Sequence, residues 1–352
     1  MSYESNANPA RKTHGLRVLA IGGGTGLSTI LKGLKSYTVQ PGEQVPEAAY
    51  ISELTAVVTV SDDGGSSGRL RRELNILPPG DIRNCLVAVA ADENLISQLF
   101  QHRFSSSGGL EGHSFGNLFL AALTATTGDF AVAVKKASEI LATRGHILPA
   151  TTANVQLEAE MDDGSRVVGE TKITASEKRI VELRMVPEDP GPLPQTLQAI
   201  ASADVITVGP GSLFTSLIPN LLVRGVAEAV AASPAIKVFI CNLMTEANES
   251  LHMTASEHIQ AIYEHAERRL FDYALVNTAP VSPVLKSRYA DERAEQVVCD
   301  VEAIEKLGVK CIGGNFMEEN RFARHATDRL CRNLLDLAGS HHRMLSREPI
   351  RH

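Results

Sequence analysis

The sequence contains no tryptophan, and aromatic residues make up only 5% of its 352 residues. Binding sites built on aromatic platforms, against which bases or sugar rings stack, are therefore not expected. Basic residues are also in the minority, because 41 Asp and Glu residues against 34 Lys and Arg residues give a formal charge of -7. A general nucleic-acid binder needs a basic field, so no nucleic-acid partner is expected.

Long apolar runs and paired cysteines are missing as well. No apolar run approaches the roughly 18 residues of a membrane span, and the polar first 14 residues lack the apolar core of a secretory signal. The five cysteines form no C-x-x-C pair, which argues against a zinc ribbon or a thioredoxin-type site. Scattered thiols are typical of a reducing compartment, so we expect a cytoplasmic protein with no membrane span.

The sequence does contain short β-branched strands that are separated by helix-like segments. Strands are predicted at residues 16–21, 55–60, 204–208, 237–241 and 273–276. Buried strands that alternate with helices indicate an α/β fold, here a Rossmann-like, mainly parallel sheet with helices on both faces.

The predicted organisation is one large domain with polar ends. Residues 1–14 are expected to be a disordered tail, residues 15–340 the Rossmann-like domain, and residues 341–352 a polar C-terminal tail. Within the domain, residues 152–186 alternate Val, Ile and Thr with polar residues, which predicts an inserted antiparallel β section. Near the C-terminus, residues 321–337 show the apolar period of a helix.

Two glycine loops that follow predicted strands are candidates for binding phosphate. Glycine lets the backbone approach a phosphate closely, and N–H groups at the start of the next helix donate to it. The first loop lacks both the Lys of a Walker A sequence and the third glycine of the dinucleotide fingerprint. A tight turn that binds nothing is the alternative for either loop. The candidate residues are Gly22, Gly23, Gly24, Thr25, Gly26, Gly209, Gly211 and Ser212.

A third loop joins two carboxylates to a run of small residues. Asp62 and Asp63 precede Gly64, Gly65 and Ser66, a composition that suits a backbone nest around an anion. Either carboxylate could hold a ribose hydroxyl, bind Mg²⁺ or act as a general base, and an Asx turn with a helix cap is the alternative. They are the catalytic and metal candidates if the protein is an enzyme, and Mg²⁺ is the one candidate cofactor.

All these loops are expected at one edge of the sheet, because ligands of such folds collect at the carboxyl ends of the strands. Several anion-binding loops favour a ligand with several phosphates, or with a phosphate and a sugar. Asn242 follows another strand, and its amide can pair with the edge of a base or cap the next helix. Asn220, in the helix after the second glycine loop, is a further binding candidate.

Seven strings in the same order resemble the gluconeogenesis factor family, the YvcK-like proteins. They are IGGGTGL at 21–27, VSDDGGSSGRL at 60–70, PPGDIRN at 78–84, FQHRF at 100–104, GHSFGNL at 112–118, GPGSLFTSLIPNLL at 209–222 and CNLMT at 241–245. The family belongs with the 2-phospho-L-lactate transferases, which move a phospholactyl group from a nucleotide diphosphate carrier onto a deazaflavin precursor. The resemblance covers nearly the whole chain.

The resemblance implies a protein that binds a nucleotide diphosphate sugar of the UDP-N-acetylglucosamine type. It also implies roles in gluconeogenic growth, cell-wall synthesis and cell shape, with cell-wall synthesis proteins and a second copy of the chain as candidate partners. Tyr289 in LKSRY and Arg324 in ARHAT match positions that contribute to nucleotide-sugar binding.

No reaction is attached to this branch of the family, so we predict a regulator. The alternative is a Mg²⁺-dependent transferase that uses a nucleotide diphosphate donor. A dinucleotide-binding protein, with Asp62 on a ribose, is a third interpretation that the missing glycine weakens.

The chain departs from the family at three places. Residues 38–53 are longer than the usual link, and Ala326 replaces the Asp of an R-H-D-T string. The string N-x-M-T-Q-P-G-E-T has Glu246, Ala247 and Asn248 where the family has Gln-Pro-Gly. This last change is expected to affect recognition of the base or sugar more than binding itself.

Overall fold

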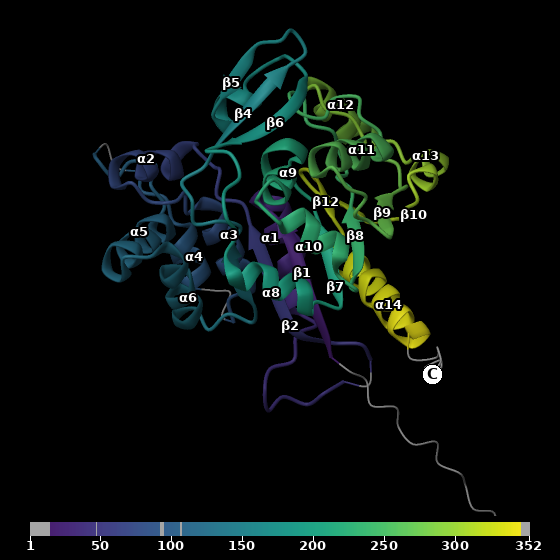
Figure 1. Ribbon diagram of the computed structural model, residues 1–352, viewed down its shortest axis with the longest axis horizontal. Coiled ribbons are helices and arrows are strands. Elements are labelled where there is room, and N and C mark those ends of the chain that lie inside the picture. Colours follow the sequence, from purple (N-terminus) through teal and green to yellow (C-terminus); the bar gives the residue numbers. More distant parts are fainter. Residues whose placement is uncertain (1–14, 47, 92–94, 106–107, 346–352) are drawn as a thin grey trace, which may run out of the picture.

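The computed structural model describes residues 15–46, 48–91, 95–105 and 108–345. Its centre is a seven-stranded sheet in which every strand pairs in parallel with its neighbour (Figure 1). The α/β prediction with a mainly parallel sheet is thereby confirmed. In spatial order the strands are β10 (Lys310–Gly314), β9 (Tyr273–Asn277), β8 (Ile236–Ile240), β7 (Val205–Val208), β1 (Leu16–Gly22), β2 (Ile51–Val58) and β3 (His146–Pro149).

Helices surround this sheet and connect its strands (Figure 1). A single turn of π-helix, Leu213–Leu217, follows β7 and runs directly into α9. The helices are α1 (Gly24–Lys35), α2 (Gly65–Leu74), α3 (Gly80–Val89), α4 (Leu95–Gln101), α5 (Phe115–Thr127), α6 (Phe130–Ile140), α7 (Glu170–Thr174), α8 (Pro194–Ser202), α9 (Ile218–Leu221), α10 (Val226–Ala232), α11 (Ala255–Ala266), α12 (Pro283–Asp291), α13 (Val301–Lys306) and α14 (Thr327–Leu345).

The predicted antiparallel insertion is a three-stranded sheet of β4 (Gln156–Met161), β5 (Arg166–Val168) and β6 (Ile180–Val186). Buried positions alternate with more exposed ones along β4, as expected for a sheet with one face on the core. Figure 1 shows this sheet at the top of the molecule. The imidazole Nε2 of His265 in α11 accepts a hydrogen bond of 3.0 Å from the Leu183 N–H, which ties the insertion to the main domain.

Two elements near the ends of the domain differ from their predicted bounds. Strand β2 begins at Ile51, four residues before the predicted start, because the exposed Ser52 and Glu53 interrupt its apolar pattern. The segment predicted as a helix from residue 321 first forms β12 (Ala323–His325), which pairs with β11 (Met317–Glu319). Each of these strands has only three residues, which is too short for a period of two to be recognised in the sequence.

The ends of the chain complete this picture. Helix α14 continues to Leu345, so the polar tail predicted from residue 341 starts with helical residues. The predicted disordered tail at residues 1–14, and residues 346–352, lie outside the described residues.

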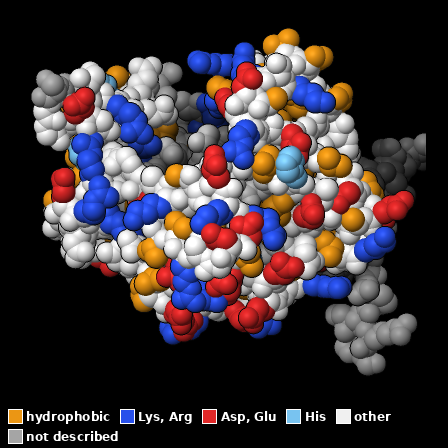
Figure 2. Space-filling model, turned by 90° about the horizontal axis from the view of Figure 1, so that it is seen from above, with side chains coloured by type: hydrophobic (Ala, Val, Ile, Leu, Met, Phe, Trp, Pro, Cys, Tyr) orange, Lys and Arg blue, Asp and Glu red, His pale blue; other side chains and the backbone are white. Residues whose placement is uncertain are grey.

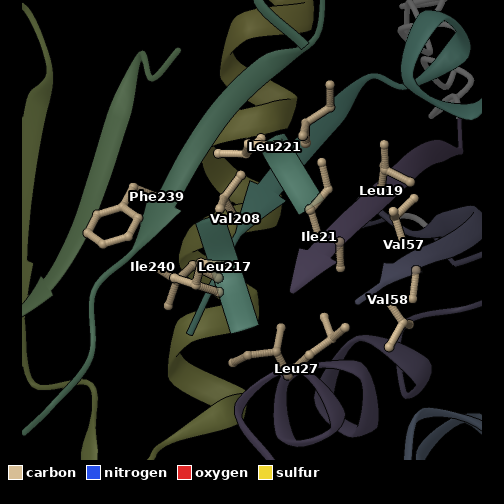
Figure 3. Close-up of a cluster of buried hydrophobic side chains, with 14 of the residues drawn as sticks. Leu19, Ile21, Leu27, Val57, Val58, Val208, Leu217, Leu221, Phe239 and Ile240 are labelled. Carbon is tan, nitrogen blue, oxygen red and sulfur yellow. The ribbon is translucent and has the colours of Figure 1, made fainter. Parts of the chain in front are cut away.

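The core is built from the central strands and the helices that begin at their carboxyl ends (Figure 3). Ile21 of β1 and Val208 of β7 are buried, and the helical residues Leu27 and Leu217 are buried beside them. A methyl group in place of the Gly22 hydrogen would contact both leucine side chains at 3.5 Å. The start of α1 is therefore held against the sheet by apolar packing as well as by its covalent connection to β1.

Removing this packing should destabilise the fold. Leu27 is fully buried, so Leu27→Ala is expected to lower the free energy of unfolding by about 2–5 kcal/mol, the range for large-to-small core changes. Leu99→Ala in α4 is the matched control, because this helical leucine is 44% exposed and its loss should change the free energy by less than about 0.5 kcal/mol. Urea unfolding of both variants measures the difference, and equal effects would contradict the packing described.

Candidate functional site

A cavity of about 680 Å³ lies at the carboxyl ends of the central strands. It collects residues from both glycine loops, from the segment after β8, from α12 and from β12, which are far apart in the sequence. The residues that line it are Gly23, Gly24, Thr25, Gly26, Thr29, Asp81, Glu170, Pro210, Gly211, Ser212, Ser216, Asn242, Leu243, Met244, Thr245, Glu246, Ala247, Tyr289, Glu292, Ala294, Phe322, Ala323, Arg324 and His325.

The first glycine loop turns directly from β1 into α1. Gly24 has φ +61°, a left-handed conformation that favours glycine, and Gly23 caps the helix without a side-chain hydrogen bond. The Asp81 carboxyl, which also lines the cavity, accepts a hydrogen bond from the Gly24 N–H at the start of α1. A helix start of this kind binds anions well.

The second glycine loop packs tightly on the first. A Cβ at Gly26 would lie 2.3 Å from the Pro210 carbonyl oxygen, so only glycine allows this approach. The Asn242 amide holds Gly211 at both backbone groups, accepting from its N–H at 3.0 Å and donating to its carbonyl at 2.8 Å. Asn242 therefore lines the cavity with an amide that already supports the loop.

Tyr289 and Arg324 reach the same cavity from the C-terminal part of the chain. The Tyr289 hydroxyl accepts a hydrogen bond of 3.0 Å from the Ala323 N–H, which holds β12 beside α12. The neighbouring His325 Nε2 lies 3.1 Å from the Cys241 carbonyl, and burial lowers the pKa of His325 to about 4. The C-terminal segment thus folds back over the cavity, and the exposed Arg324 projects from it.

Several candidate residues lie outside the cavity lining. Asn220 is fully buried and donates to the Gly22 carbonyl at 3.1 Å and to the Ser216 carbonyl at 2.8 Å, so it supports the first loop from behind. The other candidates that do not line the cavity are Gly22, Gly209, Asp62, Asp63, Gly64, Gly65 and Ser66.

The two aspartates of the third loop have local partners. The Asp62 carboxylate accepts from the Gly64 N–H at 2.8 Å, which is the Asx turn considered as the alternative. The Asp63 carboxylate accepts from the Thr171 N–H at 2.8 Å and from its hydroxyl at 2.5 Å, so it joins α2 to the insertion. Within the described residues, no three His, Cys, Asp or Glu side chains are arranged as a metal site. The Mg²⁺ role stays a prediction.

Ser66 is also engaged by neighbouring side chains. Its hydroxyl lies 2.9 Å from His113 Nδ1 and accepts from Asn117 Nδ2 at 3.1 Å. All three side chains are buried. This network anchors the start of α2 to α5.

Comparison with known proteins identifies the family. The model of the 2-phospho-L-lactate transferase CofD family matches residues 18–317. The chain belongs to the CofD family.

Gluconeogenesis factors are among its similar relatives. The one from Halalkalibacterium halodurans is 47% identical over 320 residues, which is 91% of this chain and 95% of the relative. The one from Bacillus subtilis is 45% identical over 322 residues, 91% of this chain and 98% of the relative. A crystal structure of a protein from Bacillus halodurans matches with a TM-score of 0.86 at 46% identity, covering 92% of this chain and all of that chain.

The CofD match includes both glycine loops and ends before Arg324, so β12 completes the cavity from outside the matched range. Among the described residues, no single helix is both long and apolar enough to cross a membrane, although one bent pair of helices, Leu213–Leu221 and Val226–Ala232, meets these criteria.

Four carboxyl groups that were not predicted as site residues line the cavity of this CofD family member, namely Asp81, Glu170, Glu246 and Glu292. Burial raises the pKa of Glu170 to about 9, with the charges of Asp62 and Asp81 acting in the same direction. Burial likewise raises the pKa of Asp81 to about 6, which the Gly24 N–H partly opposes. Glu246 accepts from the Ser212 hydroxyl at 2.9 and 3.1 Å, and burial raises its pKa as well.

These groups could not be placed from local patterns. Asp81 lies in the PPGDIRN string and Glu170 in the antiparallel insertion, and neither pattern indicates a site, whereas the changed string at Glu246 is the one expected to affect recognition of the base or sugar. Protonation of Glu170 at neutral pH removes a negative charge beside the glycine loops. A protonated carboxyl carries no charge, so the cavity repels a phosphate less than it would if all its carboxyl groups were ionised.

The raised pKa of Glu170 predicts how stability depends on pH. A carboxyl that holds its proton in the folded state up to about pH 9, and loses it near pH 4.5 when unfolded, makes stability fall as pH rises between these values. For one proton the slope is about 1.4 kcal/mol per pH unit. Glu170→Gln should flatten the decline between pH 7 and 9, which urea unfolding at several pH values measures.

The exposed Glu188 provides the control for this measurement. Glu188→Gln removes a carboxyl without changing the cavity, so it should keep the wild-type slope. A Glu170→Gln variant with the same slope as the wild type would show that Glu170 is ionised in the folded protein.

Proposed function

We propose that the protein binds a nucleotide diphosphate sugar of the UDP-N-acetylglucosamine type. It would act as a cytoplasmic regulator in gluconeogenic growth, cell-wall synthesis and cell shape, through cell-wall synthesis proteins and as a homodimer. The observation that carries the proposal is that the two glycine loops, Tyr289 and Arg324 all line one cavity. Its volume of about 680 Å³ is in the range of small-molecule sites.

Each part of the ligand has a counterpart in this cavity. The diphosphate would lie at the start of α1, where N–H groups and the helix dipole favour negative charge. The Arg324 guanidinium can donate two parallel hydrogen bonds to a phosphate. Residues Leu243 to Ala247 line the cavity and would face the base or sugar, while Asn242 supports the second loop rather than reading the base.

A Mg²⁺-dependent transferase with a nucleotide diphosphate donor is the second candidate. Membership of the CofD family supports it, as does the presence of Asp81 and Glu170 beside the glycine loops. In this case Asp62 or Asp63 would have to exchange its present hydrogen bonds for a metal ion.

The identity of the phosphate loop is tested by Gly24→Val. Valine is strained at φ +61°, and its side chain would alter the loop that approaches the diphosphate. Calorimetric titration with UDP-N-acetylglucosamine should show affinity at least tenfold weaker, about 1.4 kcal/mol.

Gly225→Val is a matched control, because Gly225 also has positive φ, at +76°, and a Cβ there would meet nothing within 4 Å. It carries the same backbone strain outside the cavity, so its affinity should equal that of the wild type. Unchanged affinity in folded Gly24→Val would remove the first loop from the site.

Product analysis separates the regulator from the transferase. A regulator should leave UDP-N-acetylglucosamine intact when Mg²⁺ is present, which chromatography of the nucleotides measures. Release of UMP that needs Mg²⁺, with the sugar phosphate transferred to water or to an acceptor hydroxyl, and that Asp62→Asn or Asp63→Asn abolishes, would instead establish the transferase.

A further inference from the structure

A second cavity, of about 520 Å³, adjoins the proposed nucleotide cavity. It lies among α1, α3 and α4, and it shares Thr25, Thr29 and Arg324 with the first cavity. Its charged lining residues within the described part of the chain are all basic, namely Lys32, Arg83, Arg103 and Arg324.

Arg83 is the most informative of these side chains. It is only 7% exposed, and its guanidinium is held by neutral acceptors, the Ser114 hydroxyl at 2.6 Å and the Asn84 side-chain oxygen at 2.6 Å. Its Nε is buried without a hydrogen-bond partner among the described residues. No carboxylate of the described residues forms an ion pair with it, and the charges of Asp81 and Asp62 act on it from beyond ion-pair distance. A buried cation is normally paired with an anion, because losing its hydration is costly.

A second arginine adds to this positive charge. Arg103 forms an isolated β-bridge with Ser114, the residue that holds Arg83, and it donates one hydrogen bond of 3.2 Å to the Gly112 carbonyl. Burial lowers the pKa of Arg83 and the charge of Arg103 lowers it further, while the charges of Asp81 and Asp62 act in the opposite direction. Two guanidinium groups that repel each other at a cavity gain stability together when one anion binds between them.

The surface around this region is basic as well. Figure 2 shows Lys and Arg side chains gathered on the left of the molecule, the side on which Figure 1 places α2, α4 and α5. Such a field attracts anions although the whole chain is acidic.

We propose that the second cavity binds the phosphate group of a separate small ligand, held by Arg83, Arg103 and Arg324. Guanidinium groups match phosphate oxygens through paired hydrogen bonds, and Gln101 adds a neutral donor to the lining. Because Arg324 lines both cavities, occupancy of one site changes the affinity of the other. Phosphate binding at this site follows from the basic residues of the second cavity and does not require that the first cavity binds a nucleotide.

Calorimetric titration of the full chain with inorganic phosphate tests the site. Arg103→Gln is the main variant, since this exposed side chain can change without disturbing the core. Phosphate binding should weaken about tenfold or more with the loss of this charged donor. Arg224→Gln is the matched control, because this exposed arginine pairs with Asp189 and lines neither cavity, and its affinity for phosphate should equal that of the wild type.

Two results would overturn the proposal at this stage. One is saturable phosphate binding that Arg103→Gln leaves unchanged, or no phosphate binding by the wild type. The other is phosphate binding that Gly24→Val removes and Arg103→Gln retains, which would place the anion at the first glycine loop.

A titration with phosphate in saturating UDP-N-acetylglucosamine distinguishes the source of the phosphate group. Simultaneous binding supports a separate ligand. Competition, with weaker nucleotide binding by Arg103→Gln, would mean that the nucleotide's own diphosphate occupies the cavity and would overturn the proposal. A protein that binds phosphate through Arg103 and does not bind UDP-N-acetylglucosamine would contradict the proposed function and leave this inference standing.

Discussion

The cavity at the carboxyl edge of the sheet depends on the close approach of the first turn of α1 to the Pro210 carbonyl. Only the missing Cβ of Gly26 permits it, because the carbonyl oxygen lies 2.3 Å from where that atom would be. The approach brings two helix starts, after β1 and after β7, to one cavity. The amides of Asn220 and Asn242 then hold the two loops in place through their backbone groups. Rigid loops of this kind present N–H donors to an anion without a further cost of ordering.

Charges of opposite sign are separated along this edge. Asp81, Glu170 and Glu246 line the cavity proposed for the nucleotide, and Arg83 and Arg103 line the adjoining cavity. Burial favours protonation of the carboxyl groups, whereas a guanidinium stays charged. The two cavities therefore differ in the charge and the hydrogen-bonding groups that they present to a ligand. The first offers backbone donors beside carboxyl groups that can be neutral, and the second offers permanent positive charge.

The C-terminal segment links the two cavities. Strand β12 carries Arg324 to their common boundary, and Tyr289 and His325 fix that strand through backbone hydrogen bonds. Helix α14 follows directly and packs on α1, the helix that starts at the first glycine loop. A ligand in either cavity that binds Arg324 would therefore contact β12. This strand leads directly into α14, which packs on the helix that follows the first glycine loop.

Local sequence patterns were sufficient to predict the α/β class, the glycine loops at the strand ends and the antiparallel insertion. Buried β-branched runs and glycine turns are local signals, and a parallel sheet necessarily gathers its carboxyl ends at one edge. Tertiary structure decided which polar groups face the cavity. In the sequence Asp62 and Asp63 are candidate ligands, but in the structure their carboxylates accept hydrogen bonds from the N–H groups of Gly64 and Thr171. The Asn242 side chain likewise accepts a hydrogen bond from the Gly211 N–H. Burial among residues that are distant in the sequence shifts the pKa values of Glu170 and Arg83. Such contacts cannot be predicted from a local sequence pattern.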